Sequence, residues 1–293
     1  MTTRYSIKDL EKLSGIKAHT IRAWESRYKL IEPKRTSTNI RYYGDDDLVI
    51  LLNASILVES GVKISEVAAM APQEMKDAAL AASPYLGQYN YEMNELKLAT
   101  TTFDVNRFEE VLKHCIRSYG MHKTFQSIVG DFITELGKLW LNGVVSISQE
   151  HFISSLLRQK LFASLDQLEA TKDESATTVV LYLPANELHE LGILYLAYVL
   201  KEKGYKVYYL GQSLPMEYLV DLLHVRGINH IISTFTTHPD ASELPAYLEE
   251  MNEVVHAPTQ FHFTGFQTES LDSETLPEHM HLHKSLKELG AYF

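Results

Sequence analysis

The residues best suited to metal chemistry in this sequence are Glu187 and His189, which follow the apolar run TTVVLYLP. A histidine on the loop after a buried strand can project into the crevice where parallel sheets bind ligands. A carboxylate two residues earlier can hold the second ring nitrogen and make the imidazole a more basic ligand. Gly192 would let a bulky planar group approach closely. Taken alone, such a histidine is more often a helix-cap or surface residue, so both interpretations stay open at this point.

A second set of residues suits contact with nucleic acid. Residues 1–44 carry ten Lys and Arg against four Asp and Glu, a formal charge of +6, whereas the rest of the chain carries 17 against 34, or −17. The whole-chain charge of −11 and the pI near 5.6 hide this asymmetry. Because phosphate contact needs a basic surface, only the N-terminal part is suited to bind DNA. A solvated charged face on a small helical domain is the alternative.

Three alternating histidines near the C-terminus could also hold a metal ion. On a strand, His279, His281 and His283 would present their imidazoles on one face. No cysteine or nearby pair of acids completes a zinc site. An exposed face at the edge of a sheet is therefore the simpler expectation.

Short helices and a polar hairpin are expected to position the basic residues in a domain spanning residues 1–75. Ser6 is a suitable N-cap for the first helix, and Gly15 gives the interruption of a helix–turn–helix. The segment EPKRTSTNIRYYG is too polar for a core strand and fits a basic wing. The side chains expected to reach DNA from the second helix and the wing are Thr20, Arg22, Arg27, Lys34, Arg35 and Arg41.

The rest of the chain divides into two further domains after a connector at 76–91. A 3.6-residue period over 92–172 predicts a four-helix bundle, with Asp104 capping its first long helix and Ser148 its last. From 176 to 293, strand-like and helix-like runs alternate, which predicts a doubly wound, parallel α/β domain. The fold class is thus multidomain, α and α/β.

Composition and missing motifs exclude several classes of protein. Hydrophobic residues make up 45% and charged residues 22%, as in ordinary globular proteins. The single cysteine, Cys115, fits a reducing cytoplasm. No apolar run or signal peptide indicates membrane spanning or secretion. No P-loop, Gly-x-Ser-x-Gly or Cys–His pattern indicates catalysis, so we expect a cytoplasmic protein that is not an enzyme.

The order of residues in the first 70 positions resembles the MerR family of winged-helix transcription regulators. The matching motifs are Arg-x-Trp-Glu-x-Arg-Tyr at 22–28, Pro-x-Arg at 33–35, Arg-x-Tyr at 41–43 and Asp-x-Asp-Leu at 45–48. The resemblance implies a dimer that binds inverted repeats in double-stranded operator DNA. It adds Tyr28 and Tyr42 to the DNA-facing residues, and we expect Trp24 to pack in the core of the domain.

The motif Glu-x-His-x-x-Gly at 187–192, followed by LGILYLAYVLKEKGYKVYYLGQSLP, resembles the cobalamin-binding domain of corrinoid proteins. In that family the histidine is the lower ligand of cobalt. The resemblance implies that His189 ligates cobalt and that Glu187 orients it. It also implies that Gly192, Ser233 and Gly265 lie beside the cofactor, with Ser233 at the slot for the nucleotide tail.

The bundle carries a second part of this resemblance. Trp140 and the pair Glu150-His151, with nine residues between, are similar to the helical cap of light-sensing MerR-type regulators, the CarH/LitR group. The resemblance implies that Trp140 covers the upper cobalt ligand and that Glu150 and His151 form hydrogen bonds to it. The implied cofactor is adenosylcobalamin, with methylcobalamin as the alternative.

The resemblance implies a repressor whose dimer or tetramer holds the operator until light breaks the cobalt–carbon bond. Two departures keep alternatives open. Leu141 stands where light-responsive members often have a histidine, and Thr264 and Phe266 flank Gly265 where the family has a glycine pair. A regulator that has lost cobalamin and meets a protein antagonist is one alternative. A corrinoid methyl-transfer subunit is another, disfavoured by the basic N-terminal part.

Overall fold

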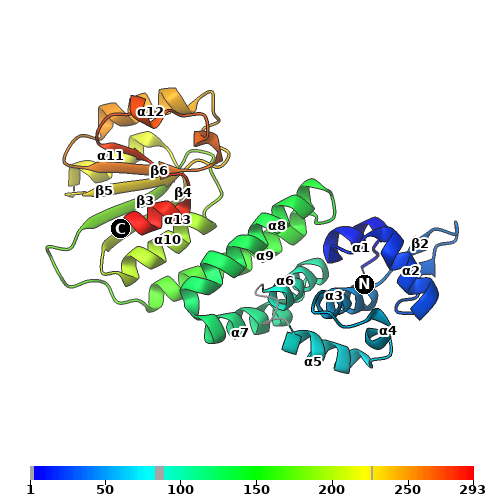
Figure 1. Ribbon diagram of the computed structural model, residues 1–293. Coiled ribbons are helices and arrows are strands. Elements are labelled where there is room, and N and C mark those ends of the chain that lie inside the picture. The colour runs from blue at the N-terminus through cyan, green and yellow to red at the C-terminus, as the bar shows by residue number, and fades with distance from the viewer. Residues whose placement is uncertain (1–2, 83–88, 226) are drawn as a thin grey trace. The chain divides into compact units, whose positions relative to one another are not determined.

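The computed structural model describes residues 3–82, 89–225 and 227–293. The chain forms two compact units, Met1–Ile153 and Ser154–Phe293. The first is helical apart from one small hairpin, and the second is built around a parallel sheet (Figure 1). The expected fold class, an N-terminal helix-turn-helix, a helical middle part and a C-terminal α/β domain, is confirmed.

The N-terminal elements form where local signals place them. The Ser6 hydroxyl accepts a hydrogen bond from the Asp9 amide, and the Asp9 carboxylate accepts one from the Ser6 amide, so a capping box starts α1. Gly15, with a φ of 75°, ends this helix. The elements of this part are α1 (Ile7–Ser14), α2 (Ala18–Tyr28), β1 (Lys34–Arg35) and β2 (Arg41–Tyr42). The two short strands pair antiparallel, which confirms the expected wing.

The following helices make up the rest of the first unit, and the last of them continues into the second unit. They are α3 (Asp45–Glu59), α4 (Ile64–Val67), α5 (Pro72–Ala82), α6 (Asn90–Thr102), α7 (Val105–Lys123), a π-helical turn (Thr124–Val129), α8 (Gly130–Leu141) and α9 (Ile147–Gln167). The expected domain boundary after residue 75 falls inside α5. Residues 83–88 of the expected connector lie outside the described residues.

The two helix caps expected in the bundle have different outcomes. The Asp104 carboxylate accepts a hydrogen bond from the Arg107 amide at the start of α7, as expected. The expectation that Ser148 caps the last helix is wrong, because α9 already begins at Ile147. Ser146 takes this role: its hydroxyl accepts from the Gln149 amide, and the Gln149 side chain accepts from the Ser146 amide.

The sheet of the second unit has the strand order β4-β3-β5-β6-β7, with every neighbouring pair parallel. Its elements are β3 (Thr178–Pro184), α10 (Leu191–Glu202), β4 (Lys206–Leu214), α11 (Met216–Val225), β5 (His230–Thr234), α12 (Leu244–Val254), β6 (Gln260–Thr264), β7 (Met280–Leu282) and α13 (Leu286–Tyr292). After β3 the chain forms the edge strand β4 on one side of β3, and it then returns to pair with the other side of β3 as β5. The strand order therefore reverses between β3 and β5, which confirms a doubly wound sheet.

Helices cover both faces of this sheet (Figure 1). One face packs on α11 and α12 through side chains such as Tyr182, Ile231 and Phe261. The other packs on α10 and α13 through Leu181 and Ile232. Burial on both faces explains why β3 is apolar along its whole length.

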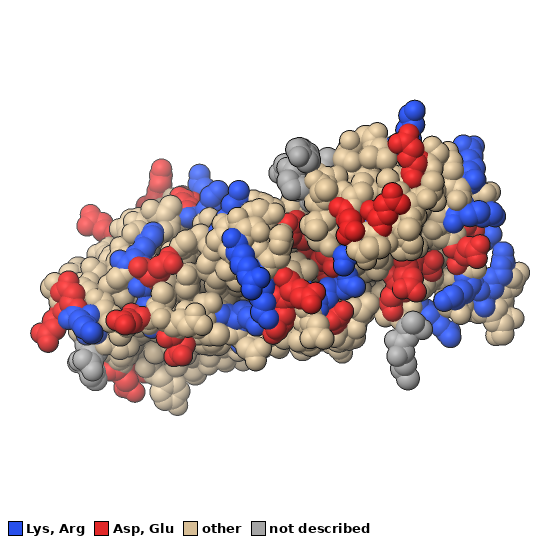
Figure 2. Space-filling model, turned by 90° about the horizontal axis from the view of Figure 1, so that it is seen from below, with Lys and Arg blue, Asp and Glu red and all other residues tan. Residues whose placement is uncertain are grey.

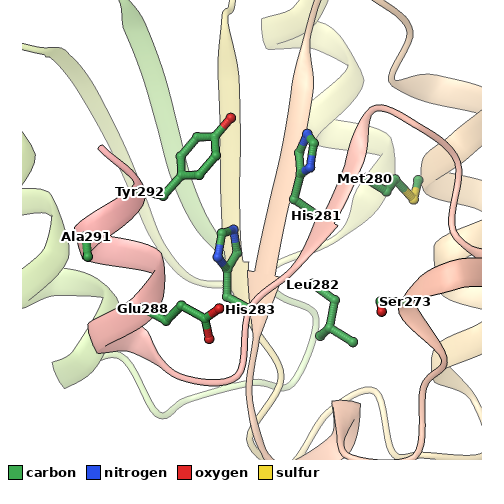
Figure 3. Close-up of a pocket in the computed structure, with 8 residues that line it drawn as sticks. All are labelled: Ser273, Met280, His281, Leu282, His283, Glu288, Ala291 and Tyr292. Atoms are coloured by element: carbon green, nitrogen blue, oxygen red, sulfur yellow. The ribbon is translucent and has the colours of Figure 1, made fainter.

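The alternating histidines His279, His281 and His283, of which only His281 lies in β7, do not form an exposed face, so that expectation is wrong. β7 is an edge strand, but α13 covers its imidazole side, and Figure 3 shows His281 and His283 projecting beside Tyr292. His262 of β6 is fully buried, and its ring stacks on those of His281 and His283. Hydrogen bonds join His262 to Nδ1 of His230, at 3.0 Å, and to Nε2 of His283, at 3.1 Å.

No group of three potential metal ligands is assembled within the described residues. The same residues contain no helix with the length and apolar character needed to cross a membrane. Cys115 is buried in α7, and burial raises the pKa of its thiol to about 12.

Candidate functional site

The Glu187 carboxylate lies fully buried at the carboxyl ends of β3 and β5. One oxygen accepts hydrogen bonds from the backbone amides of Thr236, Thr237 and His238, at 2.8, 2.6 and 3.1 Å. The other accepts from the His189 amide at 3.0 Å and lies 2.6 Å from Nδ1 of the same residue. These contacts bring Glu187 and His189 together at the point where the strand order reverses, the usual ligand-binding position of such sheets.

The protonation of this pair follows from its surroundings. Burial alone would raise the pKa of the Glu187 carboxyl, but hydrogen bonds from His189 and from the amides of Thr237 and His238 outweigh burial and hold this pKa well below its usual range. The ionised carboxylate favours the proton on Nδ1 of His189, which leaves the lone pair on Nε2. The His189 side chain is 56% exposed. This arrangement suits an imidazole that ligates a transition metal.

A second carboxylate lies beside the first in the sequence but faces other partners. Glu190 is 6% exposed at the start of α10 and forms an ion pair with Arg158 of α9. The Tyr209 hydroxyl donates to its other oxygen at 2.7 Å. Burial, with this hydrogen bond, raises the pKa of Tyr209 far above its usual range, so the hydroxyl remains a donor.

The remaining residues expected beside the cofactor are packed against protein. Ser233 is fully buried, and its hydroxyl donates to the Tyr182 carbonyl. A Cβ on Gly192 would lie 2.3 Å from the side chain of Leu286, so Leu286 occupies the space that the glycine leaves. Gly265 has a φ of 136°, and a Cβ there would lie 2.3 Å from the Phe235 carbonyl oxygen. Close approach of protein explains both glycines, and their contact with a cofactor stays a prediction.

The residues expected over the upper cobalt ligand lie in the first unit. Trp140 is the last residue but one of α8 and is 46% exposed, and Leu141, which ends the helix, is 77% exposed. Glu150 lies in the first turn of α9 and His151 follows it, with a Glu150 oxygen 2.6 Å from Nδ1 of His151. Both rings and the carboxylate are thus accessible for contact with another molecule.

The expected DNA-facing residues gather on α2 and the hairpin. Arg22, Arg27, Lys34, Arg35 and Arg41 are exposed, whereas the other three are half-buried, namely Thr20, Tyr28 and Tyr42. Figure 2 shows Lys and Arg side chains concentrated at the right end of the molecule, where Figure 1 places α2 and the hairpin. Trp24 is only 9% exposed, which confirms its place in the core.

Contacts within the N-terminal part fix the orientation of the wing. Glu25 of α2 accepts a hydrogen bond from the Tyr43 hydroxyl at 3.0 Å and lies 3.7 Å from Nε of Arg41. The Arg4 guanidinium lies over the Tyr42 ring, 4.8 Å from its centroid. Helix and hairpin therefore form one surface.

Sequence reasoning missed the partners of Glu187 and Glu190 that are distant in the sequence. Thr236 and Thr237 lie 49 and 50 residues from Glu187, and the second half of α9 and the whole of β3 separate Arg158 from Glu190. Threonine and arginine are common surface residues, and no local pattern distinguishes these. Only knowledge of the strand order would have placed the loop after β5 next to Glu187.

Known proteins resemble both the N-terminal part and the middle part of the chain. Residues 5–74 match the MerR HTH family of regulatory proteins, and residues 93–163 match a B12 binding domain. The HTH-type transcriptional repressor CarH of Myxococcus xanthus is 30% identical over 222 residues, 73% of this chain and 72% of that protein. The repressor CarA of the same organism is 27% identical over 227 residues, which cover 73% of this chain and 70% of CarA.

A solved structure shares the fold over about two thirds of the chain. The monomethylamine corrinoid protein of Methanosarcina barkeri superposes with a TM-score of 0.50 at 14% identity, covering 68% of this chain and 94% of that protein. At this identity the similarity shows the fold alone: a helical part followed by a five-stranded parallel sheet.

Proposed function

The chain belongs to the MerR-type transcriptional regulators that carry a B12-binding domain, and on this premise we propose that a cobalamin controls its binding to operator DNA. As a member of this family it is a DNA-binding regulator and not an enzyme. In the proposal it acts as a cytoplasmic repressor, like the relatives named CarH and CarA. Residues 1–75 bind DNA, 92–172 cap the cofactor, and 176–293 hold it.

The observation that carries the proposal is the buried Glu187 carboxylate hydrogen-bonded to Nδ1 of His189. This donor set fits the cofactor, because a fixed tautomer directs the lone pair of Nε2 towards a metal ion. Bound cobalamin supplies a cobalt ion that accepts this nitrogen and, when alkylated, a cobalt–carbon bond that light can break. His189 holds the ligand, and Glu187 keeps its ring orientation and tautomer.

The N-terminal surface supports operator binding by more than one copy. A single helix–hairpin surface presents five exposed basic side chains, whereas the remainder of the chain is acidic. Phosphate contacts from one such surface give modest affinity at physiological salt, and joining two surfaces raises it through effective concentration. We therefore propose a dimer, or a tetramer of two dimers, on inverted repeats.

Adenosylcobalamin is the proposed form, because the exposed Trp140 ring and the Glu150-His151 pair offer stacking and hydrogen bonds to an adenosyl group. Methylcobalamin is the alternative. Leu141 stands where light-responsive members often have a histidine. After light releases the upper group, no imidazole from position 141 could therefore take its place on the cobalt.

The test is to purify the chain with adenosylcobalamin in the dark and record its absorbance spectrum before and after green light. We expect a coloured protein, with binding weakened and the spectrum altered in His189→Ala. His256→Ala is the control, since His256 is exposed and lies outside the loop. A wild-type protein that stays colourless would overturn cobalamin control.

A regulator that answers to a protein partner instead of cobalamin is the second candidate. The packing of Leu286 on Gly192 favours it, because the space beside the motif glycine is already filled. The exposed Phe266 ring, 67% accessible, would then contact the partner. A colourless wild type whose DNA binding is unchanged by adenosylcobalamin would favour this candidate.

A further inference from the structure

Four histidines lie side by side on the sheet face that α13 covers, one in β5, one in β6 and two in or directly after β7. They are His230, His262, His281 and His283, which we call the imidazole cluster. The His262 ring is fully buried, and its centroid lies 5.1, 4.7 and 5.4 Å from those of the other three. The four rings therefore form one contact group centred on His262.

The hydrogen bonds of His262 restrict how many protons the packed cluster can hold. A neutral imidazole carries one N–H, so His262, which is bonded at both ring nitrogens, donates one hydrogen bond and accepts the other. A proton added to His262 would create a buried charge, and a proton added to a neighbouring ring as well would place two cations in contact. Both changes are unfavourable, so the packed cluster favours neutral rings.

Few charged groups surround the imidazole cluster in the part of the chain that the structure describes. The titratable side chains that face the cluster or its cover are His279 before β7, Glu288 and Tyr292 of α13, Lys203 after α10 and Tyr205 before β4. Of these side chains, only Glu288 can carry the negative charge that would offset a protonated imidazole. Burial, with the neighbouring imidazoles, lowers the pKa of His262 to about 3, and burial lowers the pKa values of the other three.

The cover of the cluster is the last turn of α13 together with Phe293. The ring centroids of Tyr292 and Phe293 lie 4.7 and 5.1 Å from that of His262. Figure 3 shows the Tyr292 ring on the same side of the sheet as His281 and His283. α13 has only seven residues, of which Leu289 alone is buried. A short helix with so few buried side chains can open locally while the sheet stays folded.

The first residue of α13 closes a second place. The Leu286 side chain occupies the space that a Cβ on Gly192 would need. Gly192 lies in the first turn of α10, three residues after His189. Because Leu286 belongs to α13, a helix that leaves the imidazole cluster also takes this side chain away from Gly192.

We propose that α13 is a lid that acid releases: protons bind the imidazole cluster when α13 leaves it, and the departure of α13 opens the space beside Gly192. The inference goes beyond the proposed function and does not depend on cobalamin. All residues that it uses belong to the second unit.

The sign of the pH dependence follows from the two states of the lid. With the lid open, the imidazoles regain an ordinary pKa of about 6.5 and take up protons below that pH, whereas the covered rings stay neutral. The stability of the closed lid is therefore complete above pH 6.5 and is lost as the pH falls. At pH 5, the proton on His262 alone favours the open lid about thirtyfold relative to pH 7.5.

The test is hydrogen exchange of the full, ligand-free chain at pH 7.5 and pH 5, followed by mass spectrometry. Exchange rates are divided by the intrinsic rates at each pH to give protection factors. We expect the protection of residues 286–292 to fall about thirtyfold or more at pH 5, and we expect β3 to remain at least about tenfold better protected at both pH values. Equal protection of α13 and β3 would show that α13 opens only by unfolding of the whole unit, which would overturn the lid.

Histidine variants test whether the imidazole cluster causes the acid effect. His262→Leu should reduce the effect on α13 by at least about tenfold, because an apolar ring position takes up no proton. His283→Leu should reduce it as well, and it keeps the test decisive if His262→Leu does not fold. His256→Leu is the matched control, since His256 is exposed in the same unit, and it should retain the full effect. An undiminished acid effect in the folded cluster variants would overturn the proposal.

Discussion

Nδ1 of His189 lies 2.6 Å from a Glu187 oxygen, and the carboxylate also accepts three backbone amides from the loop after β5. One buried charge therefore fixes both the ring that would ligate a metal and the neighbouring loop. Ligand binding and the stability of the α/β unit consequently depend on the same side chain.

Glu187→Gln should lower the free energy of unfolding by about 2 kcal/mol, because hydrogen bonds to a charged acceptor become hydrogen bonds to a neutral amide. The measurement is thermal unfolding followed by circular dichroism. Since the pKa of Glu187 is lowered in the folded chain, its contribution is present above the unfolded value of about 4.3 and is lost as the pH falls below it. The exposed Glu174→Gln should leave the melt unchanged; an equal effect of both substitutions would contradict the assignment.

The histidines under α13 should make the second unit sensitive to acid. Burial, with the neighbouring imidazoles of His281, His230 and His283, lowers the pKa of His262 to about 3. The unfolded chain takes up this proton near pH 6.5, so the stability from the neutral ring is complete above that pH and is lost as the pH falls. At pH 5 the loss from His262 is about 2 kcal/mol relative to pH 7.5.

The check is a series of urea unfolding curves between pH 7.5 and pH 5, monitored by circular dichroism. His262→Leu should flatten the pH dependence, whatever its effect on stability at neutral pH. His256→Leu is the control, because His256 is exposed. An unaltered slope in His262→Leu would show that other groups cause the acid sensitivity.

Gly265→Ala should destabilise the second unit strongly. The new Cβ would lie 2.3 Å from the Phe235 carbonyl oxygen, and the φ of 136° is itself unfavourable for alanine. We expect a loss of about 3 kcal/mol, measured by urea unfolding. Gly137→Ala in α8 meets no atom within 4 Å and should instead stabilise the chain slightly through helix propensity. Tolerance of alanine at position 265 would contradict the close approach of β5 and β6.

Arg41→Ala should weaken binding to a DNA duplex that the wild-type chain selects from a random-sequence pool about tenfold, and it should reduce the salt dependence by about one ion per monomer. Gel-shift titrations at several salt concentrations measure both quantities. Lys113→Ala removes one positive charge from the exposed side of α7 and should change neither. If both variants bind like wild type, the wing does not contact phosphate.

Local sequence signals were sufficient to predict the elements of the N-terminal part and the strands of the sheet. Ser6 and Gly15 mark the ends of α1 within one turn, and the apolar run of β3 follows from burial on both faces. The Glu187–His189 contact spans two residues, so its spacing in the sequence already implies it.

Contacts between distant segments could not be read in this way. His230, His262 and His283 come from three segments, and only the strand order and α13 bury them together. The alternating histidines in and beside β7 therefore indicated a solvent-exposed face where the structure has buried and half-buried rings. The Arg158–Glu190 ion pair likewise depends on how α9 packs, which no spacing reveals.

The chain has only two tryptophans, and the structure gives them unlike surroundings. Trp24 is 9% exposed within the DNA-binding part, whereas Trp140 is 46% exposed at the end of α8. Indole emission moves to longer wavelength as water gains access, and only an accessible indole is quenched by acrylamide. The intrinsic fluorescence of the unlabelled protein therefore has two components. Emission at shorter wavelength reports on the DNA-binding part, and emission at longer wavelength that acrylamide quenches reports on the bundle.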